Sequence, residues 1–150
     1  MVFQALENDM WNYWCTNGGP NCIILDDTNS VDFDFGGPAI LVESEGRDLL
    51  VAGQKYGDLW ALNPDTGALI WSQRVGEGTA LGGNHWGIDT NSERAFMTIN
   101  DHAGMNKNTR PGLYTYFVGT GEPSWSYEVQ SKCNDQRSKR LRRCDSMYGF

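Results

Sequence analysis

Two carboxylates near residue 33 have a spacing that is suited to chemistry. Asp32 and Asp34 alternate with Phe33 and Phe35, so on a β-strand both carboxylates face one side and both rings face the other. Two such carboxylates can bind Ca²⁺, or the pKa of one can rise until it suits proton abstraction. Asp34 is therefore a candidate catalytic base. The alternative is that these carboxylates are solvated or accept hydrogen bonds from turn amides.

Two further segments carry candidate ligand-binding side chains. Lys55 follows an apolar run and precedes a Gly turn, from which an ammonium group can face an anionic cofactor. His85 and Trp86 follow two glycines, where the backbone can approach a ligand closely. There, Trp86 would stack on a planar cofactor and His85 would hydrogen-bond it. The alternatives are a solvated loop Lys and a Trp packed between structural units.

Composition and charge exclude several classes of function. The chain has 150 residues, of which 39% are hydrophobic and 12% aromatic, so one packed domain is expected and disorder is not. No apolar run approaches the roughly 18 residues of a membrane span. The net charge of −7 argues against a general nucleic-acid binder. The basic segment 132–143 is a solvated loop, a site for an anionic partner or a protease site.

The four Cys residues form two close pairs, Cys15/Cys22 and Cys133/Cys144, whose spacing matches no standard zinc pattern. Two local disulfides that close loops 15–22 and 133–144 are the simplest interpretation, and free buried thiols are the alternative. Disulfides imply an oxidising, extracytoplasmic compartment, either secreted or periplasmic. No signal peptide is visible at the start of the chain, and we expect this chain to be a fragment that lacks the natural N-terminus.

An internal repeat organises the middle of the chain. Segment 59–71, LWALNPDTGALIW, recurs as LYTYFVGTGEPSW in 113–125 at a constant offset of 54 residues. Leu, an aromatic residue, Thr-Gly and the closing Trp keep their positions in both copies. Self-similarity at a fixed period of this size indicates a repeat architecture.

Each copy predicts a β-hairpin, because a turn that ends in Thr-Gly separates two apolar segments, and in the first copy this turn also carries Asn, Pro and Asp. Further strand pairs are expected at 39–42 and 47–53, and at 86–89 and 94–99. Four short antiparallel strands per repeat form the blade of a β-propeller. We therefore predict an all-β fragment of one propeller domain, with blades at about 31–75 and 76–130. A partial blade would precede them. Because 3–6 resembles the tail of a strand and 148–150 the start of one, we expect the chain to be a fragment of a longer protein.

The first repeat resembles the tryptophan-docking repeat of the pyrroloquinoline-quinone (PQQ) dehydrogenases, in the pattern Ala-x-Asn-x-x-Thr-Gly-x-x-x-Trp at 61–71. In that family the Trp packs between blades and the turn Gly makes room for it. The resemblance assigns this structural role to Gly67, Trp71, Gly121 and Trp125. The second copy departs from the pattern, with Thr in place of Ala at 115 and Phe in place of Asn at 117.

Longer stretches are similar to the polyvinyl-alcohol dehydrogenase branch of these quinoproteins, and the likeness covers residues 1 to about 130. They are 3–12, 20–22, 32–36, 51–57 and 82–87. The resemblance implies an eight-bladed propeller that binds PQQ and Ca²⁺ and oxidises a small or polymeric alcohol by hydride transfer. Asp34 would take the hydroxyl proton, and Lys55 would contact the quinone oxygens. Trp11-Asn12 is a competing match for the catalytic pair, although Asn cannot act as a base.

A second hypothesis is a secreted propeller that kept the fold and lost the chemistry, for example an acidic extracellular or mineralised-matrix protein. The paired Cys residues, the net acidity and the degenerate second repeat motivate it. A third hypothesis is a scaffold for protein partners. The calcium ligands cannot be identified from the sequence. Uptake of PQQ separates the first hypothesis from the other two.

Overall fold

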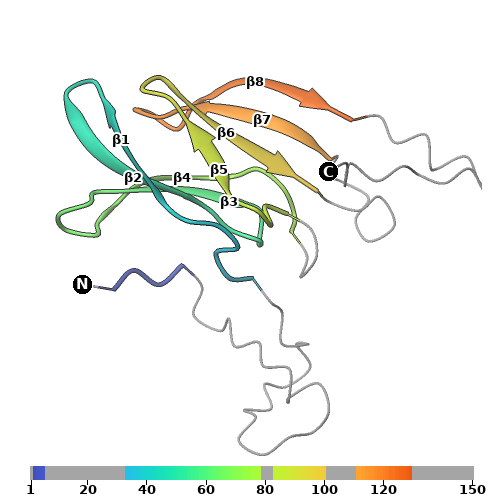
Figure 1. Ribbon diagram of the computed structural model, residues 1–150, viewed down its shortest axis with the longest axis horizontal. Coiled ribbons are helices and arrows are strands. Elements are labelled where there is room, and N and C mark those ends of the chain that lie inside the picture. Colours follow the sequence, from blue (N-terminus) through green and yellow to red (C-terminus); the bar gives the residue numbers. More distant parts are fainter. Residues whose placement is uncertain (1, 6–32, 79–82, 101–110, 130–150) are drawn as a thin grey trace, which may run out of the picture.

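The computed structural model describes residues 2–5, 33–78, 83–100 and 111–129, which form two four-stranded antiparallel sheets (Figure 1). The first sheet contains β1 (Ile40–Ser44), β2 (Arg47–Gly53), β3 (Asp58–Leu62) and β4 (Leu69–Arg74). The second contains β5 (Ile88–Thr90), β6 (Arg94–Ile99), β7 (Gly112–Phe117) and β8 (Pro123–Glu128). Strands that follow one another in sequence are neighbours in each sheet. This is the strand order of propeller blades, so the predicted all-β fold with two blades is confirmed.

The turn between β3 and β4 is built by its own side chains. The Asn63 Oδ1 accepts hydrogen bonds from the Asp65 and Thr66 amides at 3.0 and 2.8 Å. Gly67 adopts a φ of 68°, and its amide donates to the Asn63 carbonyl at 2.8 Å. These bonds are local in sequence, which explains why the turn is evident from residue types alone.

The two sheets pack face to face, and their facing side chains form one core. Alternate residues of β2 and β3, such as Val51 and Leu59, are fully buried in it. The buried members are Leu49, Val51, Leu59, Ala61, Trp71, Ala95, Met97, Ile99, Tyr116 and Val118. Because both sheets contribute, neither blade could bury its facing side chains without the other.

Trp71 of β4 lies against the turn that joins β7 and β8. Its indole nitrogen donates to the Val118 carbonyl at 2.9 Å, and its side chain is 9% exposed. A Cβ on Gly121 would lie 2.6 Å from the ring atom Cδ2 of Trp71. The Trp of one repeat therefore contacts the turn Gly of the next repeat. Trp125, the equivalent residue in the second sheet, is 47% exposed.

We expect Gly121→Ala to destabilise the fold more than Gly46→Ala does, although both glycines have a φ of 75°. A left-handed backbone costs an L-residue about 1–2 kcal/mol at either site. The new methyl group at 121 also meets the Trp71 ring, whereas nothing lies within 4 Å of a Cβ at 46. Overpacking of this kind adds about 1–3 kcal/mol. Urea unfolding of both variants measures the difference, and equal losses would contradict the packing argument.

Three local predictions differ from the structure. Residues 33–35 form no strand. Their backbone makes one hydrogen bond to the backbone of the β2–β3 turn, from the Lys55 amide to the Asp34 carbonyl, and not the series of bonds that pairs two strands. Residues 2–5 also form no strand, and Phe3 meets the first sheet through its ring, 5.3 Å from that of Trp60. The expected strand at 86–89 begins at Ile88, after Gly87 with a φ of 101°. Cys15, Cys22, Cys133 and Cys144 lie outside the described residues, as do Trp11 and Asn12.

Candidate functional site

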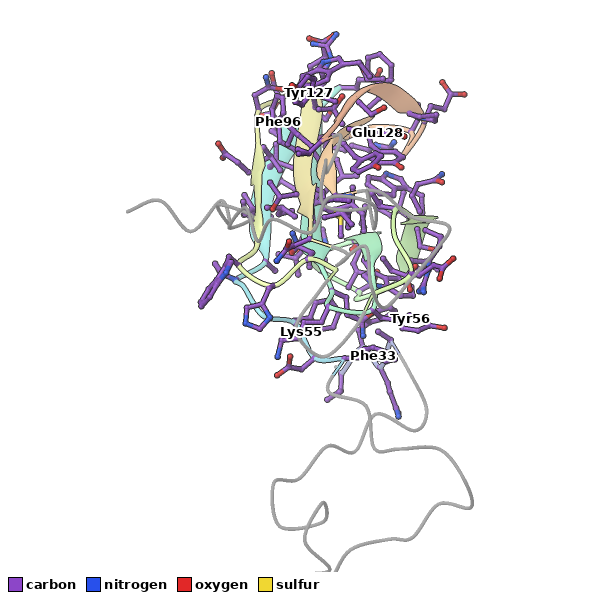
Figure 2. The ribbon with its side chains drawn as sticks, turned by 90° about the vertical axis from the view of Figure 1, so that its right-hand side faces the viewer. Phe33, Lys55, Tyr56, Phe96, Tyr127 and Glu128 are labelled. Atoms are coloured by element: carbon purple, nitrogen blue, oxygen red, sulfur yellow. The ribbon has the colours of Figure 1, made fainter. Side chains whose placement is uncertain are left out.

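Three segments that are distant in sequence meet at one end of the first sheet. They are 33–37 before β1, the β2–β3 turn at 54–57 and the segment 83–87 before β5. Phe33, Lys55 and Tyr56 lie side by side there (Figure 2), and the rings of Phe33 and Tyr56 are 4.6 Å apart. Asp34, Lys55, His85 and Trp86, which the sequence nominates separately, all belong to these three segments.

Asp34 and Lys55 form an ion pair in this region. The Lys55 Nζ lies 2.7 Å from the Asp34 Oδ1, and the Lys55 amide donates to the Asp34 carbonyl at 3.1 Å. The Lys55 side chain is 10% exposed, whereas that of Asp34 is 63% exposed. The buried cation thus holds a carboxylate that solvent and small molecules can reach. An accessible carboxylate beside a fixed cation can accept a proton from a hydroxyl group.

Glycines allow the segments to approach backbone to backbone. A Cβ on Gly83 would lie 1.9 Å from the Lys55 carbonyl oxygen, and a Cβ on Gly36 would lie 2.2 Å from that of His85. No other residue type fits at either position without a shift of the backbone. The glycines before His85 were predicted to let a ligand approach. In the structure, Gly83 lets the β2–β3 turn approach instead.

His85 and Asn84 each bury a polar atom that has no hydrogen-bond partner among the described residues, His85 Nδ1 and Asn84 Oδ1. The fully buried Asn84 anchors the segment through its amide nitrogen, which donates to the Gly87 and Thr98 carbonyls at 2.6 and 3.1 Å. A Cβ on Gly53 would lie 2.5 Å from Oδ1, so this oxygen faces the Gly53 α-carbon, a weak donor. The His85 nitrogen therefore remains the polar atom in this segment that still requires a partner.

Trp86 is 77% exposed, and its ring lies 4.7 Å from that of His85 in an edge-on arrangement. An exposed indole face beside a buried ring nitrogen is suited to a planar ligand with polar edges. Sequence reasoning missed two residues of this region, Gln54 and Asn84. Both are polar residues beside apolar strands, and polar side chains buried at such positions need specific partners.

Asp58 and Arg74 form a second ion pair close to the turn, with 3.2 Å between the Arg74 Nη1 and the Asp58 Oδ2. Burial raises the pKa of the Asp58 carboxyl, and Arg74 opposes this by a smaller amount. The folded chain therefore binds this proton more readily than the unfolded chain. The stability that Asp58 contributes is fully present below about pH 3.8 and is lost as the pH rises through the raised pKa.

We expect Asp58→Asn to remove this pH dependence, because the amide does not titrate. The free energy of unfolding of the variant should rise relative to that of the unmodified protein between pH 3 and pH 7. Urea midpoints across this range measure the difference. Asp48→Asn, at an exposed position of β2, is the control and should leave the profile unchanged. If the stability of Asp58→Asn and that of the unmodified protein changed with pH in parallel, Asp58 would not be the source of the pH dependence.

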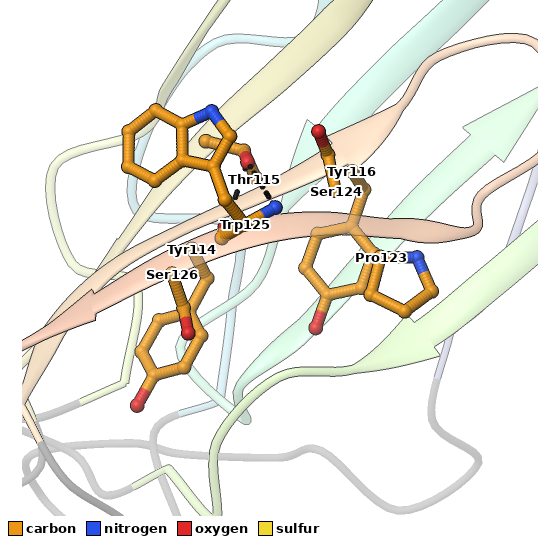
Figure 3. Close-up of a pocket in the computed structure, with 7 residues that line it drawn as sticks. All are labelled: Tyr114, Thr115, Tyr116, Pro123, Ser124, Trp125 and Ser126. Carbon is orange, nitrogen blue, oxygen red and sulfur yellow. Dashed lines mark hydrogen bonds between the residues drawn. The ribbon is translucent and has the colours of Figure 1, made fainter.

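A shallow depression of about 290 Å³ lies elsewhere, over β7 and β8 (Figure 3). One of its lining residues is Thr115, which replaces the Ala of the first repeat. The Thr115 hydroxyl donates to the Trp125 carbonyl at 2.7 Å and accepts from the Trp125 amide at 3.0 Å. These bonds bridge an irregularity in the pairing of the two strands. The depression includes none of the candidate catalytic or cofactor-binding residues, and we assign it no ligand.

Within residues 2–5, 33–78, 83–100 and 111–129, no group of three or more His, Cys, Asp or Glu side chains is placed to hold a metal ion. No helix in these same ranges is long and apolar enough to cross a membrane. The candidate site therefore consists of one ion pair, one buried ring nitrogen and one exposed indole.

The chain is similar in sequence to two proteins named polyvinylalcohol dehydrogenase. The protein from a Pseudomonas species is 36% identical over 98 residues, which cover 64% of this chain and 15% of the relative. The protein from Sphingopyxis sp. strain 113P3 is 30% identical over 127 residues, which cover 83% of this chain and 19% of the relative. The chain thus spans less than a fifth of the length of these curated relatives.

No family model matches the chain. Among solved structures, the crystal structure of BamB from Moraxella catarrhalis matches with a TM-score of 0.42 and 17% identity. The match covers 63% of this chain and 24% of that chain. The assignment of two blades rests on the strand pairing of the chain itself.

Proposed function

We propose that this chain, a relative of polyvinylalcohol dehydrogenases, is part of a PQQ-dependent enzyme that oxidises an alcohol. The observation that carries the proposal is the 2.7 Å ion pair between Lys55 and the accessible carboxylate of Asp34. Sequence similarity to two such enzymes supports it independently. Asp34 would accept the proton of the substrate hydroxyl, and the reaction would remove a hydride from the carbon that carries it.

The residues of the site fit a planar, anionic quinone. The buried Nδ1 of His85 has no described partner and would hydrogen-bond a polar edge of the ring system. Trp86 offers an exposed face for stacking, and the Lys55 ammonium would stabilise negative charge on the quinone oxygens. When bound, PQQ supplies the hydride acceptor. Calcium is implied by the resemblance, but the described residues offer no cluster of ligands for it, so no role here depends on it.

The substrate class that we propose is a small or polymeric alcohol, and the location is secreted or periplasmic. An accessible carboxylate, 63% exposed, suits a substrate that is too large to enter a closed cavity. The alternative, a non-catalytic propeller in an extracellular matrix, rests on the acidic net charge of −7. The two hypotheses differ in whether the protein takes up the quinone.

The test is reconstitution of the intact protein with PQQ and Ca²⁺, followed by reduction of an artificial dye with polyvinyl alcohol or a short secondary alcohol. Quinone retained after gel filtration, detected by its absorbance, reports binding separately from turnover. We expect retention and alcohol-dependent dye reduction. Retention without turnover would contradict the catalytic proposal, and absence of retention would favour the matrix protein.

A further inference from the structure

Gln54 fastens the segment that carries Asp34 to the first sheet, and we infer that it is a positioning residue for that carboxylate. The inference rests on the function proposed for Asp34. Gln54 is the residue directly after β2, and its side chain is 2% exposed. Its sequence position assigned it no role of its own, although it lies in the stretch 51–57 that resembles the quinoproteins.

Both ends of the Gln54 amide have a partner. Its Oε1 accepts a hydrogen bond from the Trp60 indole nitrogen at 3.0 Å, and its Nε2 donates to the Phe33 carbonyl at 2.8 Å. Since an indole can only donate, the bond to Trp60 fixes which end of the amide faces Phe33. Gln54 thereby joins β3 of the first sheet to the residue that immediately precedes Asp34.

Further contacts hold the same segment. The Lys55 amide donates to the Asp34 carbonyl, and the Phe33 ring packs on Tyr56, whose other neighbour is the Arg74 guanidinium at 3.6 Å. These contacts set the height of the segment over the turn. The hydrogen bond from Gln54 sets the direction of the peptide between Phe33 and Asp34, because its acceptor is the Phe33 carbonyl. A carboxylate displaced by about 1 Å can lose about a hundredfold in rate.

The decisive variant is Gln54→Glu. A protonated Glu keeps an acceptor for Trp60 and still donates to the Phe33 carbonyl, whereas the ionised form can only accept. Burial raises the pKa of such a carboxyl. Among the described residues, the charged groups of this turn and of the residues paired with it are Asp34, Lys55, Asp58 and Arg74. We expect kcat near that of the unmodified protein at low pH and about a hundredfold lower once the Glu ionises, with KM changed less than threefold.

Gln54→Met keeps the volume and removes both bonds at every pH. We expect a pH-independent loss of about a hundredfold in kcat and faster hydrogen exchange at the Lys55 amide, whose acceptor is the Asp34 carbonyl. Gln73→Met, at a half-buried position of β4 in the same sheet, is the matched control and should change neither. If Gln54→Met left both kcat and the rate of hydrogen exchange at the Lys55 amide unchanged, the inference would be overturned.

The exchange measurement also separates this inference from the proposed function. If the intact protein oxidises no alcohol, while Gln54→Met speeds exchange at the Lys55 amide, the proposed function fails and the anchoring role of Gln54 stands. If the protein is active and the Gln54→Glu profile shows no added ionisation, the proposed function stands and the positioning role fails.

Discussion

Asp34→Asn in the intact, reconstituted protein should lower the rate of alcohol oxidation at least about a hundredfold and leave the fold intact. The amide cannot accept the hydroxyl proton, and it also loses its charge–charge attraction to Lys55. Because the Asp34 side chain is 63% exposed, its removal creates no cavity. Steady-state dye reduction measures the rate, and a urea unfolding curve measures the fold.

Asp48→Asn is the control for this experiment, because Asp48 is an exposed carboxylate of β2 at the opposite end of the first sheet. It should keep full activity. Quinone retention should persist in Asp34→Asn, since Lys55, His85 and Trp86 are unchanged. Undiminished turnover in Asp34→Asn would remove this carboxylate from the mechanism and would leave the ion pair with a structural role.

Trp71→Ala should lower the free energy of unfolding by about 3–5 kcal/mol, the usual cost of deleting a large buried aromatic side chain. Trp71 is 9% exposed and fills the space between the first sheet and the turn at Gly121. Its loss also leaves the Val118 carbonyl without the indole donor. The midpoint of urea unfolding checks the prediction, and the tryptophan fluorescence of the remaining residues reports the transition.

Trp71→Phe separates the two contributions. The smaller ring keeps most of the apolar contact and loses the 2.9 Å hydrogen bond to Val118, so part of the loss, about 1 kcal/mol, comes from the bond. Trp86→Ala is the control for stability, because Trp86 is 77% exposed, and it should stay within about 0.5 kcal/mol of the unmodified protein. Similar losses for Trp71→Ala and Trp86→Ala would show that Trp71 does not join the sheets.

The strands and turns could be predicted because the interactions that form them are close in sequence. Alternation of buried residues along β2 and β3 follows the two-residue period of a strand. The turn at Asn63 is closed by bonds that span two to four residues. The constant offset of 54 residues then implied two similar sheets. The alternation around Asp34 is compatible with a strand, but residues 33–35 form none, because alternating residue types do not reveal whether a pairing partner exists.

For the candidate site, the sequence predicted the residues and the structure supplied their contacts. Sequence by itself nominated Asp34, Lys55, His85 and Trp86 and related the chain to quinoproteins. This was possible because the type of a side chain determines which chemistry it can do, wherever it lies. Only the tertiary structure decided that Lys55 pairs with Asp34, 21 positions away, and that Gln54 reaches the Phe33 carbonyl. It also decided that Trp71 packs on the Gly of the following repeat. These contacts depend on how the segments cross the ends of packed sheets, and long-range packing of that kind leaves no periodic trace in a single sequence.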